Sequence, residues 1–273
     1  MRKEVLAMQL IQFCKKVFEW EGLDIYLKPY QILSTGLHAG LVEFLEGTQS
    51  VDRIKKGLPR GFNALKDHFE LNFGESYSFV YAKALQNFVR SLAGYSLVTY
   101  IVQVKDRHNA NILVDADGHL IHIDYGFILG GTYSACLLAC LLCRTILLSS
   151  LPWPALASQL LRLIHPSSHP PSPRLIPSSI DSPGFNINFE SAPFKFPLEY
   201  LELMGGVDSA AFKSFEDLFL RGFLAMQKHI DGLTSIVQVQ CSVATTALFS
   251  LSLCAGVCMG VCVHSLYIPS LQR

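Results

Sequence analysis

The hydrophobic and polar positions change period several times along the chain, and each change predicts a different element. Apolar residues recur at helical spacing over residues 2–20, and Gly22 follows to end the helix. Apolar and polar residues alternate over residues 25–34, which predicts a strand, although Pro29 confines that strand to an edge or a bulge. A short apolar run at residues 41–45 predicts a second strand.

Residues 77–100 predict a long apolar helix. It is long enough to imitate a membrane span, but Lys83, Asn87 and Arg90 favour a buried core helix, in which Gly94 permits close packing.

Two further segments, residues 50–74 and 197–239, have less regular patterns. Residues 50–74 carry basic and turn-forming residues and predict a connector with one helix. Residues 197–239 hold two helical patterns, and the pair Gly205 and Gly206 separates them.

The run from Val104 to Gly126 predicts a loop, a β-hairpin and another loop. Residues 112–114 form one strand, residues 116–118 the turn, and residues 120–123 the return strand. Because a hairpin brings its two ends together, the polar residues before the first strand should face those that follow the second.

Four polar side chains at these hairpin ends suit phosphoryl transfer, which needs metal ions on the phosphates and an acceptor hydroxyl held in line. The amide of Asn111 and the carboxylate of Asp124 offer hard oxygen ligands to Mg²⁺. Asp106 or His108 can take or steer the proton of the attacking hydroxyl. Asp106 precedes Asn111 by five positions, the interval between Asp and Asn in the protein-kinase catalytic loop, although the order D-R-H differs from H-R-D.

The string Q-V-K-D-R-H-N-A-N-I-L at residues 103–113, followed by D-Y-G from Asp124, resembles the phosphatidylinositol 3- and 4-kinase superfamily, and within it the type III beta 4-kinases. An ordinary structural hairpin with solvated charges is the alternative. The resemblance covers residues 2–130 and 181–240. It implies an α+β fold of the protein-kinase-like type, namely a mostly helical large lobe with a catalytic-loop β-hairpin and little of the small lobe.

The same resemblance implies a division of the chain. Residues 1–48 correspond to the end of the small lobe and the hinge, residues 49–130 to the large lobe with the catalytic loop, and residues 181–240 to the activation loop and further large-lobe helices. Residues 131–180 form an off-pattern insertion expected to be disordered or apolar. Residues 241–273 form an off-pattern apolar tail.

The resemblance also implies an ATP site. In the family, the strand at residues 41–45 leads into the hinge, which places adenine against the backbone carbonyl of Glu43 and the backbone amide of Leu45. Glu4 lies in a helix that supports the ATP site in the family, and either pairs with a catalytic lysine or stands as an exposed helix charge.

The string S-P-G-F-N-I-N-F-E-S-A-P-F-K, which ends at Lys195, resembles the activation loop of the family. That likeness implies contact between Lys195 and the headgroup of an inositol phospholipid, since a lysine suits a phosphodiester as a point charge. It also implies that Phe189 and Phe194 touch the membrane.

The implied activity is transfer of the ATP γ-phosphate to the 4-hydroxyl of phosphatidylinositol in a membrane surface, with Mg²⁺ or Mn²⁺ as cofactor. Small GTPases or adaptors are implied partners, and the implied location is cytoplasmic and peripheral on Golgi or other endomembranes. The family's phosphate-covering loop and ATP-binding lysine precede the helix that opens this chain, so we expect the chain by itself to be inactive.

Composition adds a few constraints. Lys and Arg together number 22, as do Asp and Glu, so the net charge gives no indication of a nucleic-acid partner. The first residues do not form a signal peptide, because charged residues interrupt them. The cysteine spacing predicts neither a disulfide framework nor a zinc site, which favours a cytosolic setting.

Three alternatives to an enzyme stay open. The chain can be a large-lobe fragment that acts as a binding module without catalysis. Residues 241–263 are 23 residues without charge, and a helix of that length rising 1.5 Å per residue crosses a hydrocarbon core of roughly 30 Å, so they can anchor a membrane protein. Finally, residues 131–180 and 241–273 both lack acidic side chains, which also fits translated non-coding sequence.

Overall fold

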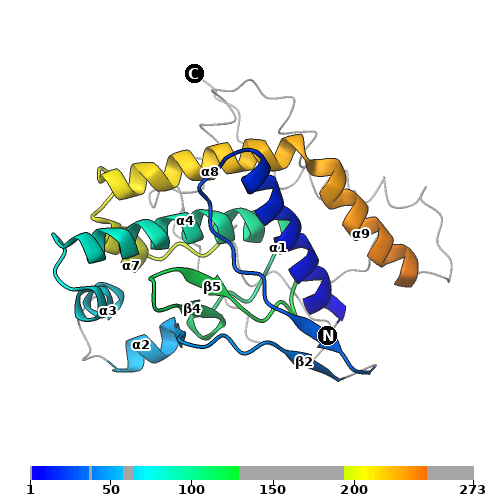
Figure 1. Cartoon of the computed structure of the whole chain (residues 1–273), viewed down its shortest axis with the longest axis horizontal. Helices are drawn as coiled ribbons and strands as arrows, with labels where there is room; N and C mark the ends of the chain where they lie inside the picture. Colours follow the sequence, from blue (N-terminus) through cyan, green and yellow to red (C-terminus); the bar gives the residue numbers. More distant parts are fainter. Residues whose placement is uncertain (1, 37–38, 58–63, 129–193, 245–273) are drawn as a thin grey trace, which may run out of the picture.

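The computed structural model describes residues 2–36, 39–57, 64–128 and 194–244 (Figure 1). This part of the chain is α+β and mostly helical. Its helices are α1 (Arg2–Trp20), α2 (Val51–Gly57), α3 (Ala64–Phe73), α4 (Phe79–Val102), the 3-10 helix η1 (Asn109–Asn111), α7 (Leu198–Met204), α8 (Ala210–Lys228) and α9 (Ile230–Ala244). Its strands are β1 (Ile32–Ser34), β2 (Gly40–Val42), β3 (Gln49–Ser50), β4 (Ile112–Val114) and β5 (Leu120–His122).

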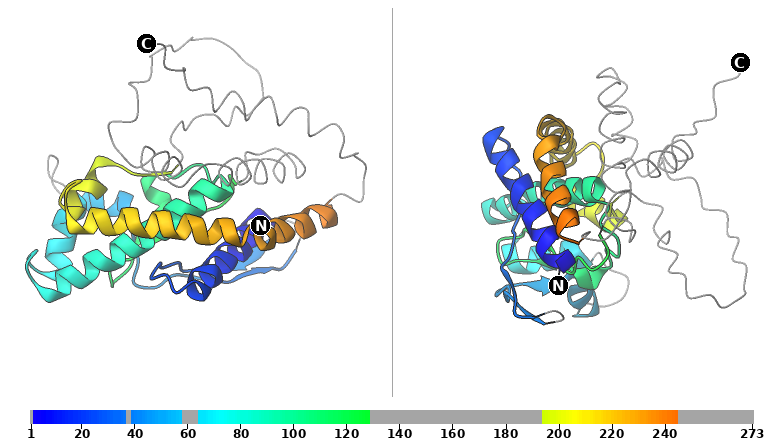
Figure 2. Two further views of the ribbon diagram at one scale, coloured as in Figure 1. Left: turned by 90° about the horizontal axis from the view of Figure 1, so that it is seen from above. Right: turned by 90° about the vertical axis from the view of Figure 1, so that its right-hand side faces the viewer.

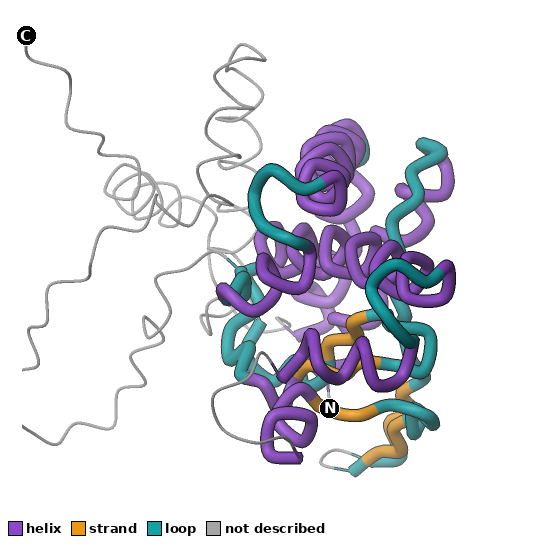
Figure 3. The backbone as a smooth tube through the Cα atoms, turned by 90° about the vertical axis from the view of Figure 1, so that its left-hand side faces the viewer, coloured by secondary structure: helices purple, strands orange, loops and turns teal. Residues whose placement is uncertain are grey.

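The strands form two small antiparallel sheets that lie on the same side of α4 and α8 (Figures 1 and 3). One sheet pairs β1 with β2, and the other has the order β3-β4-β5. Within the β4–β5 hairpin, Ile112 pairs with His122 and Val114 with Leu120. The hairpin predicted from the sequence is therefore confirmed, except that the return strand ends one residue earlier, at His122.

Helix α4 is the central element of the core, and it packs against α8 on one side and β5 on the other (Figure 1). Ser78 caps its first turn by accepting a hydrogen bond from the backbone N–H of Tyr81 at 3.1 Å. Gly94 lies so close to the neighbouring chain that a Cβ built there would stand 2.6 Å from the carbonyl oxygen of Tyr26. The predicted core helix and the predicted close packing at Gly94 are both confirmed.

Helix α1 packs against α8 and α9, which lie at the other end of the described chain (Figures 1 and 2). Its fully buried face consists of Leu10, Ile11, Cys14, Val17 and Phe18. At its exposed end, one carboxylate oxygen of Glu21 lies 2.7 Å from both Lys228 Nζ and His229 Nε2. The first helix of the chain thus completes a core that the last described helices also form.

Several predicted elements require correction. The second predicted strand, residues 41–45, is observed as β2 over Gly40–Val42, so it begins one residue earlier and ends three residues earlier. Residues 25–31 are irregular instead of forming a strand, because the backbone N–H groups of Tyr26 and Lys28 donate to acceptors on α4 and not to a neighbouring strand. The connector at residues 50–74 contains two helices, α2 and α3, where one was predicted. The last helical pattern breaks at His229 into α8 and α9.

Within the described ranges, no helix combines the length and hydropathy that a membrane span requires. Helix α9 includes the first residues of the uncharged run 241–263, up to Ala244, and the remainder of that run lies outside the described residues. The predicted insertion at residues 131–180 also lies outside them.

Candidate active site at the open end of the hairpin

Backbone hydrogen bonds close the open end of the β4–β5 hairpin. The N–H of Ile123 donates to the carbonyl oxygen of Asn111 at 3.0 Å, one step beyond the Ile112–His122 pair. Further out, the N–H of Lys105 donates to the carbonyl oxygen of Phe127 at 2.8 Å. The loops before and after the hairpin therefore lie side by side, which brings the backbones of Asn111 and Asp124 to one place.

Asp106 and His108 form the outer part of this group. The side-chain Nε2 of His108 lies 3.9 Å from Oδ1 of Asp106, and the two side chains are 55% and 43% exposed. The backbone N–H of Ala110 donates to Nδ1 of His108 at 3.2 Å, at the start of η1. Because Nδ1 accepts, a neutral His108 ring carries its proton on Nε2, the atom that faces Asp106.

Asn111 and Asp124 form the inner part. The amide nitrogen of the buried Asn111 side chain donates to the carbonyl oxygen of Asp106 at 3.0 Å, which leaves the amide oxygen as the atom for a ligand. The N–H of Gly126 donates to one carboxylate oxygen of the exposed Asp124 at 3.2 Å. One amide oxygen and one carboxylate are donors of the kind that Mg²⁺ and Mn²⁺ prefer, so the side chains present fit such an ion.

Two of these four residues have unusual backbone conformations. Among the described residues other than glycine, only Gln103, Asp106 and Asp124 have a positive φ, and the two aspartates have φ values of 63° and 58°. Aspartate tolerates the left-handed region better than most residues, but the conformation still costs about 1 kcal/mol or more. It persists because the surrounding hydrogen bonds hold the loops in place.

Arg107 is the buried residue between these loops. Its side chain is 2% exposed, and it donates from Nε to the carbonyl oxygen of Lys105 at 3.1 Å and from Nη1 to that of Ile123 at 2.8 Å. A third hydrogen bond runs from Nη2 to the carbonyl oxygen of Asp124. The guanidinium carbon also lies 5.2 Å from the centre of the Tyr125 ring. The sequence reasoning missed this residue, because the letters D-R-H do not reveal that the arginine points inward.

Glu4 of α1 reaches the same site from the other side. Its carboxylate is half-buried and accepts a hydrogen bond from the backbone N–H of Tyr125 at 2.7 Å. Burial, reinforced by the nearby charge of Asp124, raises the pKa of Glu4 above its usual value. The prediction of an exposed helix charge is therefore wrong, since the side chain connects α1 to the D-Y-G segment.

The two residues expected at the adenine site lie beyond β2. The backbone N–H of Glu43 donates to the carbonyl oxygen of Gln31 at 2.9 Å, while the N–H of Gln31 donates to the Glu43 side chain at 2.7 Å. Among the described residues, none donates a hydrogen bond to the carbonyl oxygen of Glu43. Leu45 is partly buried against the core. No hydrogen bond between described residues joins Glu43 or Leu45 to the hairpin end.

Lys195 lies just before α7 and is partly buried. The rest of the predicted activation loop, including Phe189, lies outside the described residues, and no described contact brings Lys195 to the hairpin end. Phe194 is 5% exposed, and its ring packs 5.3 Å from the ring of Phe219. The expectation that Phe194 touches the membrane is therefore wrong, because its ring belongs to the core.

A second polar cluster lies at the closed end of the hairpin. Ligand atoms of Asp115, Asp117 and His119 lie within 4.8 Å of one another. However, Oδ1 of Asp115 accepts hydrogen bonds from the backbone N–H groups of Asp117 at 3.0 Å and His119 at 2.8 Å. The Asp115 carboxylate thus stabilises the turn, and this cluster needs no ion to account for it.

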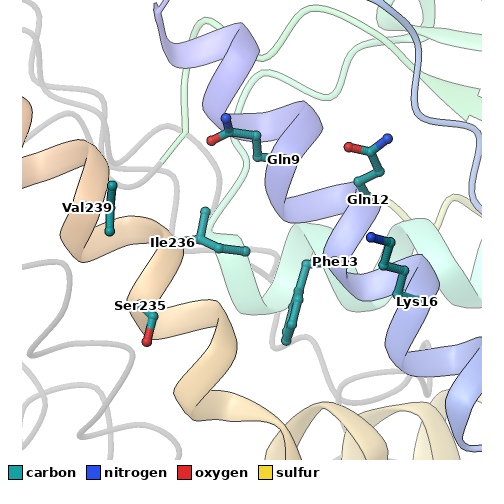
Figure 4. Close-up of a pocket in the computed structure, with 7 residues that line it drawn as sticks. All are labelled: Gln9, Gln12, Phe13, Lys16, Ser235, Ile236 and Val239. Carbon is teal, nitrogen blue, oxygen red and sulfur yellow. The ribbon is translucent and has the colours of Figure 1, made fainter.

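A groove of about 450 Å³ lies between α1 and α9 (Figure 4). It is lined mainly by apolar surface, and its residues are Gln9, Gln12, Phe13, Lys16, Ser235, Ile236 and Val239. None of the residues predicted to bind substrate or metal lines it, so the groove is separate from the hairpin-end site.

Comparison with known proteins shows the family of this chain. The family profile described as "Phosphatidylinositol 3- and 4-kinase" matches residues 1–170. A phosphatidylinositol 4-kinase of Dictyostelium discoideum is 34% identical over 241 residues, which cover 88% of this chain and 16% of that protein. The human phosphatidylinositol 4-kinase beta is 32% identical over 239 residues, which cover 88% of this chain and 23% of that protein. The chain thus spans less than a quarter of the length of these relatives.

Proposed function

Because this chain belongs to the phosphatidylinositol 3- and 4-kinase family, we propose that it carries the catalytic loop of a phosphatidylinositol 4-kinase. The proposed reaction transfers the γ-phosphate of ATP to the 4-hydroxyl of phosphatidylinositol. The observation that carries the proposal is the meeting of Asp106, Asn111 and Asp124 at one end of the hairpin. The relatives' names support a 4-kinase over a 3-kinase, since they are phosphatidylinositol 4-kinases.

The proposed metal ligands are the amide oxygen of Asn111 and the carboxylate of Asp124. A Mg²⁺ or Mn²⁺ ion held there would offset the negative charge of the phosphate oxygens. The protein's own part is to hold both ligands rigidly. The hydrogen bond from Asn111 to the Asp106 carbonyl fixes the amide plane, and the N–H of Gly126 orients the carboxylate of Asp124.

The proposed proton acceptor for the attacking hydroxyl is the Asp106–His108 pair. Both side chains are partly exposed, so a substrate hydroxyl can reach them. With the proton of a neutral His108 ring on Nε2, facing Asp106, the carboxylate of Asp106 is the group with a free lone pair for the hydroxyl proton. His108 lies beside that carboxylate, with Nε2 at 3.9 Å from Oδ1.

The remaining contacts in the proposal come from the family resemblance. The backbone carbonyl oxygen of Glu43 and the amide of Leu45 hold the adenine, and Lys195 contacts the phosphodiester of the lipid headgroup. A substrate that lies in a bilayer requires the enzyme to work at a membrane surface, so the proposed location is peripheral on Golgi or other endomembranes. Adaptors or small GTPases are the proposed recruiting partners.

A lipid-kinase assay on phosphatidylinositol vesicles tests this function. Because the relatives are longer, the assay compares this chain alone with a form that carries the relatives' preceding segment. We expect the longer form to make phosphatidylinositol 4-phosphate in a Mg²⁺-dependent way, and the chain alone to bind Mg²⁺-ATP with little turnover. A product phosphorylated at the 3-position, or no Mg²⁺-dependent nucleotide binding by either form, would overturn the proposal.

A further inference from the structure

We propose that Arg107 is a positioning residue for Asp124, which holds the metal-binding loop from behind and does not contact the nucleotide. The inference rests on the proposed function, since it assigns the metal to Asp124. It concerns the middle residue of the D-R-H motif, whose neighbours Asp106 and His108 carry the exposed polar groups of the site. A cationic residue between them suggests a phosphate ligand, but the side chain of Arg107 points into the protein.

Burial is the first observation. The Arg107 side chain is 2% exposed, whereas the side chains on either side of it are about half exposed. A buried guanidinium must satisfy its N–H donors internally. Nε, Nη1 and Nη2 each donate to a backbone carbonyl oxygen. Each of the three guanidinium nitrogens is therefore bound to a backbone carbonyl group, and burial keeps the side chain away from a phosphate.

The identity of those carbonyl groups is the second observation. The carbonyl of Ile123 belongs to the peptide plane that precedes the Cα of Asp124, and the carbonyl of Asp124 belongs to the plane that follows it. Arg107 donates to both. The orientation of these two planes determines φ and ψ of Asp124, whose φ is 58°. One guanidinium consequently holds Asp124 in the left-handed conformation that directs its carboxylate.

The hydrogen bond from Nε and the contact with the Tyr125 ring connect Arg107 to both loops. Nε donates to the carbonyl of Lys105 in the loop before the hairpin, so the same side chain joins the loop of Asp106 to the loop of Asp124. The guanidinium also faces the Tyr125 ring at 5.2 Å, a cation–π contact of the kind that arginine favours. The geometry requires arginine, because the single ammonium of a lysine cannot span two carbonyl groups with a planar fork.

The experiment compares Arg107→Lys and Arg107→Met with Arg221→Met, an arginine on α8 that is half exposed and pairs with Asp217. Mn²⁺ affinity is measured by electron paramagnetic resonance in the presence of saturating ATP. Hydrogen–deuterium exchange is followed for the peptide that contains Tyr125 and Gly126. In the longer, active form, kcat and KM for ATP are measured across Mg²⁺ concentrations.

We expect both Arg107 variants to weaken Mn²⁺ binding by about 10- to 100-fold, in the range found for partners that orient metal ligands. Exchange at Tyr125 and Gly126 should accelerate, and kcat should fall while KM for ATP at saturating Mg²⁺ changes little. Arg221→Met should alter none of these quantities. If Arg107→Met does not fold, Arg107→Lys decides the question, because it keeps the charge and the alkyl chain.

Two results would overturn the positioning role. One is an Arg107→Lys protein with parental Mn²⁺ affinity and parental exchange at Tyr125. The other is a rise in KM for ATP with an unchanged Mg²⁺ requirement, which would assign Arg107 to the nucleotide. Failure of the proposed function gives a different result, in which the parent protein binds no Mn²⁺-ATP although exchange at Tyr125 still responds to Arg107→Lys.

Discussion

The carboxylate of Glu4 accepts a hydrogen bond from the backbone N–H of Tyr125 at 2.7 Å, although the two residues lie 121 positions apart. Tyr125 immediately follows Asp124, so the first helix of the chain is bound to the segment proposed to hold the metal. Arg107 holds the same segment from its other side, through the carbonyl of Asp124. The conformation of Asp124 thus depends on two residues that belong to different parts of the chain.

Replacing Glu4 tests this connection. Glu4→Ala removes the acceptor and leaves the N–H of Tyr125 without a partner, which should cost about 1–3 kcal/mol of unfolding free energy. Glu4→Gln keeps an acceptor oxygen and removes a half-buried charge, so it should be close to neutral. Chemical denaturation measures both variants, with Glu19→Gln on the exposed face of α1 as the control. Equal losses in Glu4→Gln and Glu4→Ala would show that charge, and not the hydrogen bond, is the important property.

The same residue predicts a pH dependence. Burial raises the pKa of Glu4 above 4.5, so the folded state binds its proton more tightly than the unfolded state does. The contribution of Glu4 to the free energy of unfolding is therefore greatest at low pH. It declines as pH rises from about 4.5 through the folded-state pKa. Glu4→Gln should become relatively more stable than the parent across that window. A constant difference between the two proteins from pH 4 to 7 would contradict the shift.

Asp124 gives a prediction on metal binding. Asp124→Asn keeps a side chain that tolerates the left-handed region but removes the carboxylate, so Mg²⁺-dependent nucleotide binding should weaken and activity should fall at least ~100-fold. Asp124→Ala should abolish activity. Titration of Mg²⁺ in the presence of ATP checks both variants. The control is Asp117→Asn, an exposed aspartate at the closed end of the hairpin. Turnover of Asp124→Ala near the parent rate would remove Asp124 from the proposed site.

Lys195 gives a prediction on substrate choice. Lys195→Ala should reduce phosphorylation of phosphatidylinositol while sparing ATP hydrolysis in the absence of lipid. The substitution removes a positive charge that is proposed to bind the lipid headgroup and not the nucleotide. Vesicle assays and a coupled ATPase assay measure the two activities in parallel. Lys213→Ala, at an exposed position on α8, provides the matched control. Equal loss of both activities would indicate a folding defect and not a headgroup contact.

Gly94 gives a prediction on packing. Alanine is a better helix former than glycine by about 1 kcal/mol, but a Cβ at this position would stand 2.6 Å from the carbonyl oxygen of Tyr26. Steric strain should outweigh the helix preference, and Gly94→Ala should lose about 1–3 kcal/mol of unfolding free energy. Gly57→Ala, where a Cβ meets nothing within 4 Å, should be tolerated. Thermal unfolding of the two variants checks the contrast, and a stabilised Gly94→Ala protein would refute it.

Local patterns were sufficient to predict part of this structure. The D-R-H and D-Y-G motifs predicted the family, which the comparisons confirm. The hairpin at residues 112–123 could be predicted because a tight turn separates two short apolar runs. Helix α1 could be predicted because its apolar residues recur at helical spacing, and α4 because it is a long, almost uninterrupted apolar stretch. These features depend on neighbours within a few positions.

The rest depends on contacts that span the chain. Residues 25–31 have the alternation of a strand, but Tyr26 and Lys28 donate to partners on α4 some 60 to 70 positions away. The hydrogen bond of Glu4 could not be predicted either, because its partner lies far along the chain on the D-Y-G segment. Arg107 is the clearest example of a residue whose environment could not be predicted, since its burial could not be inferred from the charged residues on either side.

The position of α1 has a consequence for synthesis in the cell. Its apolar face is covered by α8 and α9, and about 190 residues separate the end of α1 from the start of α8. At ~5–20 residues per second, a ribosome needs about 10–40 s to make that stretch. Throughout this interval the part of the helix that α8 and α9 cover in the finished protein stays open, so we expect it to be a binding site for chaperones until translation reaches those two helices.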